Sequence, residues 1–311
     1  MAAVGWLRCA EGEVLPLEVT PNLQKFVNGV INESVNANTL FASQESISTG
    51  RYRQRISGQP DKNYTTVRLP AETALGEPGD TTRPYLMGNG ALLRTTTGVA
   101  PVDGIGQSDD TKTELFALSG GAGLLIRVSD SLTLAPSAAL TYSHVENDYE
   151  FNNPYSQQNF SPADRELFNW NLEVFTYSPA LKMYYQHDLG FGALHYNLGY
   201  TYLFNDSIAS NSSAINISSS TGLATNRVDI QVPTGASVAG SPISVRPMFQ
   251  WNNISGSAVA GLGLRDLFEV GGDVVAEVLE AGTWISTITA GASYVSGKDF
   301  EGYHVGFGAT F

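Results

Sequence analysis

Apolar and polar residues alternate strictly at the C-terminal end of the chain. In the final run the apolar and aromatic residues are Tyr303, Val305, Phe307, Ala309 and Phe311. The small or polar residues between them are His304, Gly306, Gly308 and Thr310. Since a period of two is the period of a β-strand, this stretch is predicted to be a strand with one apolar and one polar face.

The same alternation recurs along most of the chain and predicts about twelve strands, an even number as in single-chain bacterial membrane barrels, with ten or fourteen as the alternatives. The expected strands cover residues 50–57, 64–70, 83–96, 113–128, 131–146, 167–186, 190–205, 226–234, 242–253, 265–279, 282–296 and 302–311. The alternation breaks near Ser178 and Pro179, which predicts a β-bulge that shifts the register.

Loop lengths and aromatic positions favour a membrane barrel over a soluble β-sandwich. Tight turns alternate with long connections at 98–112, 147–165 and 206–225. Outer-membrane barrels have short periplasmic turns and longer extracellular loops, so both termini are expected to be periplasmic. Outward aromatic residues then gather at the two ends of the strands, as in membrane girdles, whereas sandwich-core aromatics need not. The extracellular set is Trp170, Tyr142, Tyr200, Tyr202, Trp251, Tyr294 and Tyr303, and the periplasmic set is Trp284, Tyr184 and Phe311.

Composition limits the remaining function classes. Only 15% of the 311 residues are charged, which is low for a soluble domain. No run of 18 or more apolar residues is present, so a helical membrane protein is excluded. The net charge of −13 argues against a nucleic-acid partner. The single Cys9 allows no internal disulfide, and no spacing of residues indicates a metal site or another cofactor.

One helix is predicted, near the N-terminus. Residues 1–20 form an irregular leader, and Thr20, Pro21 and Asn22 make a plausible helix start. Apolar residues follow at helical spacing up to Val35. We therefore divide the chain into the leader, a helix with its linker at 21–48, and a transmembrane β-barrel at 49–311.

This organisation resembles the translocator barrel of bacterial autotransporters, in which a helix leads into about twelve strands. It is most similar to the solitary, passenger-less barrels of that group, because only a short leader precedes the helix. The resemblance covers roughly residues 21–311 and implies that the helix lies inside the pore. It also implies that the C-terminal pattern of Tyr303 to Phe311 is the signal by which the outer-membrane assembly machinery recognises the chain.

Charged residues on the strands are predicted to line the lumen. Those expected to face inward are Arg51, Arg53, Arg55, Arg68, Arg94, Arg127, Glu173, Arg246, Glu269, Asp273 and Glu277. A pore of this width is not filled by side chains alone, so these groups could meet the polar side of the plug helix. The helix residues expected to do so are Lys25, Asn28, Asn32 and Glu33. The alternative is that the lumen charges only solvate an open channel.

The histidines do not point to catalysis. His144 shares its face with Glu146, Asp148 and Glu150, and the spacing of two places them outward. There they are expected to solvate a strand that leaves the membrane or to bind divalent cations weakly. His195 and His304 are expected to face the lumen and to make a hydrogen bond there.

The sequence thus predicts an all-β, antiparallel up-and-down barrel that spans the bacterial outer membrane, with its N-terminal helix occluding the pore. No enzymatic activity and no cofactor are expected. The expected partners are outer-membrane lipid, lipopolysaccharide and the assembly machinery, and the protein is expected to be a monomer. The alternative function is a channel or porin for small solutes that the helix gates.

Overall fold

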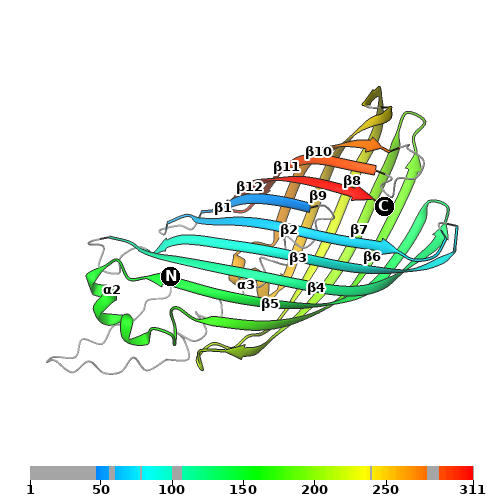
Figure 1. Cartoon of the computed structure of the whole chain (residues 1–311). Coiled ribbons are helices and arrows are strands. Elements are labelled where there is room, and N and C mark those ends of the chain that lie inside the picture. Colours follow the sequence, from blue (N-terminus) through cyan, green and yellow to red (C-terminus); the bar gives the residue numbers. More distant parts are fainter. Residues whose placement is uncertain are drawn as a thin grey trace.

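The chain forms a closed barrel of twelve antiparallel strands, each paired with its neighbour in sequence, and the last strand pairs with the first (Figure 1). The computed structural model describes residues 47–55, 60–77, 79–99, 107–238, 240–278 and 287–310. The strands are β1 (Ile47–Gln54), β2 (Lys62–Ala74), β3 (Thr82–Val99), β4 (Asp109–Ser129), β5 (Leu132–Glu150), β6 (Asn171–Asp188), β7 (Ala193–Ser210), β8 (Ser218–Val238), β9 (Ser241–Gly256), β10 (Asp266–Glu277), β11 (Thr287–Gly297) and β12 (Phe300–Thr310). The predicted barrel and its strand number are confirmed.

Within the described ranges, three short helical segments interrupt the connections. They are α2 (Pro154–Asn159), the 3₁₀ turn η2 (Ser161–Ala163) and α3 (Ser257–Leu262). The predicted N-terminal helix lies outside the described residues. No helix among the described residues is long and apolar enough to cross a bilayer.

The two ends of the barrel differ in their connections. Tight turns join β4 to β5 and β6 to β7, and β1 begins and β12 ends at this same end, since Ile47 pairs with Phe307. We call it the short-turn end. The connections that carry α2 and α3 lie at the opposite, long-loop end (Figure 1).

Two strand predictions need correction. β8 is much longer than the expected 226–234, because its Ser- and Thr-rich beginning pairs with β7 and β9 although its composition is typical of a loop. The predicted bulge at Ser178 and Pro179 is wrong. Both residues pair with β5 without interruption, and the register shift lies between Glu173 and Val174.

The outer face of the strands is apolar over most of its height. Tyr303, Val305 and Phe307 of the predicted assembly signal are exposed on this face, and His304 between them is buried. Ala309 pairs with Ile288, while Phe311 lies outside the described residues. A surface of exposed Leu, Val, Phe and Tyr that closes into a cylinder suits lipid rather than water.

The predicted girdle residues divide between the two faces. Tyr142, Tyr200, Trp251, Tyr294 and Tyr303 are exposed on the outer face as expected, and Tyr202 follows the outward parity of Tyr200.

The girdle positions predicted for Trp170 and Tyr184 are wrong, and those predicted for two other residues fall outside the described ranges. Trp170 is buried in the interior with only 3% of its surface exposed. Tyr184 lies on the inward face, where its strand partners are Thr133 and Asn197. It is eight residues beyond the buried Thr176, and no register shift lies between the two residues. Trp284 and Phe311 lie outside the described residues.

A charge on the lipid face tests the membrane assignment. Leu118 lies near the middle of β4 and is 59% exposed on the outer face. Leu118→Arg is expected to lower the free energy of unfolding in a bilayer by about 2–4 kcal/mol, because the guanidinium must enter the hydrocarbon. Urea titration of protein folded into vesicles measures this change.

The matched control is Asn171→Arg, at the long-loop start of β6, where the outer face is exposed and polar. It is expected to change the unfolding free energy by less than about 0.5 kcal/mol. Equal effects of the two arginines would contradict a lipid-facing band at Leu118.

Candidate functional site

The predicted lumen residues fall on both faces of the barrel. The structure places on the inward face Arg68, Arg127, Arg246, Glu269, Asp273 and Glu277. The residues that lie on the outward face, against prediction, are Arg51, Arg53, Arg55, Arg94 and Glu173. The plug-helix residues Lys25, Asn28, Asn32 and Glu33 lie outside the described residues.

The outward arginines have a physical cause. The buried residues of β1 and β2 include the aromatic Tyr52 and Tyr64, which pack on Phe300 with ring centroids 5.6 and 5.9 Å away. Because Tyr52 fills the lumen, Arg51 and Arg53 on either side of it must point outward. The buried Leu93 places Arg94 outward in the same way. The predicted arginines of β1 and β3 therefore do not line the lumen, where Tyr52, Tyr64 and Leu93 lie instead.

Glu173 is outward for a related reason. It lies directly opposite His144 in the β5–β6 pair, and the two side chains meet at 3.2 Å between His144 Nδ1 and Glu173 Oε1. The outward position predicted for His144 is confirmed, since the residues on either side of it, Ser143 and Val145, are buried.

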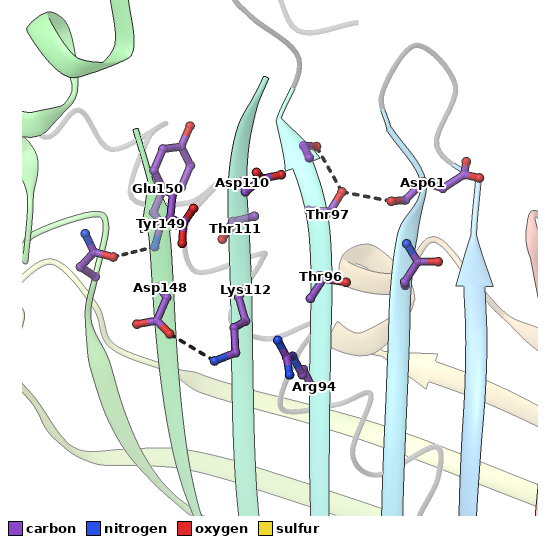
Figure 2. A pocket seen from close by; sticks show the side chains of 13 residues that line it. Asp61, Arg94, Thr96, Thr97, Asp110, Thr111, Lys112, Asp148, Tyr149 and Glu150 are labelled. Carbon is purple, nitrogen blue, oxygen red and sulfur yellow. Dashed lines mark hydrogen bonds and ion pairs between the residues drawn. The ribbon is translucent and has the colours of Figure 1, made fainter. Parts of the chain in front are cut away.

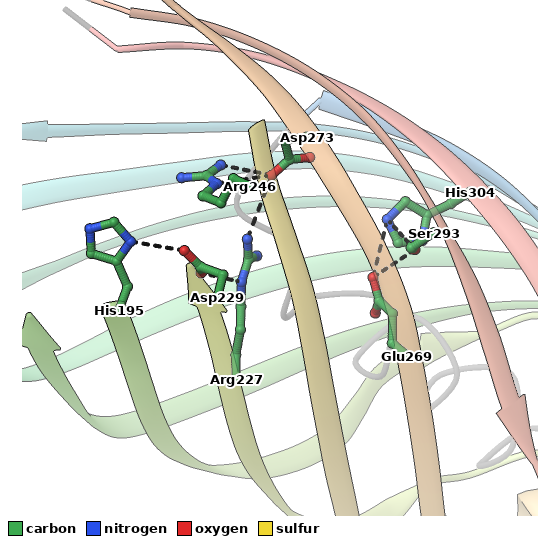
Figure 3. Close-up of polar contacts among 8 residues, drawn as sticks. All are labelled: His195, Arg227, Asp229, Arg246, Glu269, Asp273, Ser293 and His304. Atoms are coloured by element: carbon green, nitrogen blue, oxygen red, sulfur yellow. Dashed lines mark hydrogen bonds and ion pairs between the residues drawn. The ribbon is translucent and has the colours of Figure 1, made fainter. Parts of the chain in front are cut away.

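A network of paired charges lies on the inward face in the middle of the barrel (Figure 3). The Asp229 carboxylate accepts from Arg227 Nε at 3.2 Å and lies 2.8 Å from His195 Nδ1. The Asp273 carboxylate accepts from Arg246 Nη2 at 2.8 Å and lies 3.7 Å from Arg227 Nη2. Arg227 thus joins two carboxylates from different strands, and the charges compensate one another within the lumen.

Sequence reasoning found Arg246 and Asp273 in this network but missed Arg227 and Asp229. Both missed residues lie on β8, whose bounds were poorly defined by the sequence. The signal was present, because Val228 and Ile230 alternate with them. The expected lumenal hydrogen bond of His195 is confirmed by its contact with Asp229.

A second cluster joins three neighbouring strands. Ser293 Oγ donates to Glu269 Oε1 at 2.7 Å and lies 3.0 Å from His304 Nδ1, and His304 Nε2 lies 3.4 Å from Glu269 Oε1 (Figure 3). The residue types are those of a hydrolase triad, but in a triad the serine hydroxyl gives its proton to histidine. Here the hydroxyl is directed at the carboxylate, and all three side chains are buried. The geometry is that of a structural hydrogen-bond network.

The long-loop end of the lumen is filled by three connections that fold inward. They contribute to one buried apolar cluster Ala163, Leu167, Trp170, Ala214, Ile215, Ile217, Ala258, Leu262 and Leu264. These residues pack against inward side chains of the strands, including Leu115, Val145 and Leu172. We call the inward-folded parts at 161–170, 211–217 and 257–264 the stopper.

Helix α3 is tied to both sides of the barrel. At one end Ala258 N donates to Thr221 Oγ1 of β8 at 3.2 Å, and at the other the Leu262 carbonyl accepts from Gln54 Nε2 of β1 at 2.6 Å. Strands β8 and β1 are not neighbours in the barrel, so α3 reaches across the lumen, within the outline of the barrel in Figure 1. Tyr64 supports the second anchor by donating to Gln54 Oε1 at 2.7 Å.

Two glycines allow the chain to leave the barrel wall before α3 and to return to it after the helix. Gly256 and Gly263 flank the helix with φ values of 81° and 65°, a region that other residues adopt rarely. The sequence analysis missed α3 and the stopper altogether. The available signal was the apolar, glycine-flanked stretch from Ala258 to Leu264, which does not alternate.

No metal centre is visible in the part of the chain that the structure describes, since no group of three His, Cys, Asp or Glu side chains is arranged to hold an ion. The charged and histidine side chains of the two lumenal clusters bind one another. The arrangement offers packed apolar side chains at the long-loop end and compensated charges in the middle of the lumen.

Comparisons with known proteins agree with this architecture. A family model described as "Solitary outer membrane autotransporter beta-barrel domain" matches residues 33–307. No curated protein matches the sequence significantly.

Solved structures show the same fold. The translocator domain of the autotransporter NalP from Neisseria meningitidis is similar with a TM-score of 0.58 and 13% identity, over 91% of this chain and 99% of that one. The transport unit of the autotransporter AIDA-I from Escherichia coli has a TM-score of 0.57 and 12% identity, over 92% and 99% of the two chains. The beta domain of the Bordetella autotransporter Brka has a TM-score of 0.52 and 12% identity, over 86% and 100%.

Proposed function

This chain belongs to the solitary outer-membrane autotransporter β-barrel family, and from that premise we propose that it is a non-catalytic barrel whose lumen is closed at rest. The observation that carries the proposal is the stopper, whose apolar residues are packed against the inward side chains of the long-loop end. A protein chain or solute could pass only if this packed cluster left the lumen.

The orientation that we propose places the long-loop end outside the cell and both termini in the periplasm. It is supported by the difference in connection length between the two ends, which in outer-membrane barrels distinguishes extracellular loops from periplasmic turns. The exposed row of Tyr303, Val305 and Phe307 supports recognition of the last strand by the assembly machinery.

We further propose that the N-terminal helix occupies the short-turn part of the lumen. The charged network of Arg227, Arg246 and Asp273 offers groups of both signs to the helix residues Lys25, Asn28 and Glu33. The stopper and the helix would then close the barrel from opposite ends, and either alone would suffice to block a large solute.

Single-channel conductance in planar bilayers tests the proposal. The full chain is expected to be silent, because both barriers are present. A chain that lacks residues 1–46 is also expected to be silent or nearly so, since the stopper remains. Stable conductance by the full chain would contradict a closed barrel and would favour the alternative, a channel for small solutes.

A further inference from the structure

Arginine and lysine on the outer face gather in one sector at the long-loop end. Among the strands that the structure describes, the outward basic residues are Arg51, Arg53, Arg94 and Lys112, on β1, β3 and β4, and Arg55 follows β1 directly. Carboxylates of the same sector, Asp61, Glu114, Asp148 and Glu301, pair with some of these cations.

These arginines stand at the upper edge of the apolar band. Val67 and Leu92, which are exposed on the outer face, lie two residues closer to the middle of the barrel than Thr65 and Arg94. Two residues of a strand span about 7 Å. Tyr303, a predicted girdle residue, pairs directly with Arg51. Arg51 and Arg94 are therefore at the level of the headgroups of the surrounding lipid.

Not all of these charges are available to a ligand. Glu301 Oε1 binds Arg53 Nη2 at 2.7 Å and Arg55 Nη2 at 2.8 Å. Arg51 makes no ion pair with any residue in the described ranges. Arg94 has one distant pair there, 3.7 Å from its Nε to Glu114 Oε1, and its side chain is 57% exposed.

Arg51 and Arg94 flank Thr65. The strand register places Thr65 directly opposite Arg51 on one side and Arg94 on the other. Neighbouring strands lie about 4.8 Å apart, so the two guanidinium-bearing residues start about 10 Å apart and can converge on one group above Thr65. Planar guanidinium groups bind phosphate with two hydrogen bonds each.

A polar cleft of about 780 Å³ opens beside this trio at the ends of β2 to β5. Arg94 lies at its lower edge, Lys112 lies in one row with its strand partners Thr96 and Asp148 two residues farther toward the loops, and Thr111 lies beyond that row (Figure 2). Lys112 is held there by Glu114 at 3.1 Å and Asp148 at 3.5 Å. Hydroxyl and carboxylate groups in such a cleft suit the hydroxyls of a sugar better than a second anion.

We propose that this sector binds a phosphorylated glycolipid of the outer leaflet, the lipid A part of lipopolysaccharide. Its phosphate lies between Arg51 and Arg94 above Thr65, its sugar enters the cleft, and its acyl chains run along Val67 and Leu92. The inference rests on the proposed orientation, in which the long-loop end faces outward. The lipid would fix the height of the barrel in the membrane.

The test compares two double variants of the full chain. R51Q/R94Q removes the proposed phosphate ligands, and R165Q/R265Q removes the same charge from exposed positions in loops at the same end. The binding of bis-phosphorylated lipid A and of lipid A without phosphates is measured by native mass spectrometry. Heat-dependent mobility in gel electrophoresis shows that each variant is folded.

R51Q/R94Q is expected to bind phosphorylated lipid A at least about tenfold more weakly, which corresponds to the loss of one charged hydrogen-bonded contact or more. R165Q/R265Q is expected to bind as the wild type does, and lipid A without phosphates is expected to bind both variants alike. Equal losses in the two variants, or equal binding of both lipids by the wild type, would overturn the proposal.

The outcome is separable from the proposed function. R51Q/R94Q leaves the lumen untouched, so its conductance is expected to match that of the wild type. An epitope inserted after Gln107, which is exposed in the connection between β3 and β4 and lies outside the stopper, tests the orientation by antibody binding to intact cells. Epitope exposure without phosphate-dependent binding would overturn the lipid site alone.

Discussion

Replacing Leu262 and Leu264 by aspartate, in a chain that lacks residues 1–46, is expected to turn a silent barrel into one that conducts ions continuously. Both leucines are buried in the stopper, with 2% and 0% of their surface exposed. Each substitution removes apolar burial and places a carboxylate among apolar groups, which destabilises the packed state by at least about 3 kcal/mol per site. The stopper then leaves the lumen.

The barrel itself is expected to survive this change. Its strands are held by a closed ladder of backbone hydrogen bonds, and the two leucines lie in the connection between β9 and β10, outside that ladder. Conductance steps in planar bilayers measure the opening, and heat-dependent gel mobility verifies the fold.

The matched control is Arg265→Asp, one residue beyond Leu264 but exposed. It introduces the same carboxylate without entering the cluster and is expected to leave the truncated barrel silent. A folded, silent L262D/L264D variant would contradict the role of the stopper as a barrier.

Asp273→Asn is expected to lower the free energy of unfolding by about 2 kcal/mol, because it removes the charged acceptor of a partly buried, hydrogen-bonded ion pair. Asp273 Oδ2 lies 2.8 Å from Arg246 Nη2 and 3.7 Å from Arg227 Nη2. The variant leaves the two guanidinium groups close together in the lumen without the carboxylate between them. Urea titration of the folded barrel measures the change.

Two further variants distinguish this network from a general effect of charge. Glu277→Gln lies on the same face of the same strand, and Glu277 has no ion pair within the described ranges, so a change below about 0.5 kcal/mol is expected. Adding Arg246→Gln to Asp273→Asn should restore part of the lost stability, because it removes one of the unpaired charges. Independent, additive effects of the two changes would contradict the proposed coupling.

The strand number and the outer face could be predicted from the sequence because the barrel wall separates two different media. Lipid outside and polar groups inside the middle of the lumen impose an alternation with the period of a strand. Val305 and Phe307 are exposed and His304 is buried as that rule requires. Arg246, Glu269 and Asp273 followed the same rule and were placed correctly.

The alternation rule gave the wrong inward face at the long-loop end, where the two faces of the wall no longer meet lipid and a polar lumen. At the long-loop end the outside is at headgroup level and the lumen is filled by the stopper, so Tyr52 turns inward and Arg51 and Arg53 turn outward. The alternation of β1 would be the same whether the arginines or Tyr52 faced the lumen. The pattern alone therefore does not show which set is inward. The sequence shows the period but not which face meets which medium.

By itself, the amino-acid sequence determined that this protein is a closed β-barrel of about twelve strands, because strand periodicity is a local property of neighbouring residues. Only the tertiary structure decided that Arg227 joins Asp229 to Asp273, that α3 crosses the lumen, and that Arg51 and Arg94 flank Thr65. These contacts join residues that are distant in sequence. They depend on strand register and on how the loops fill the available space, which no local pattern specifies.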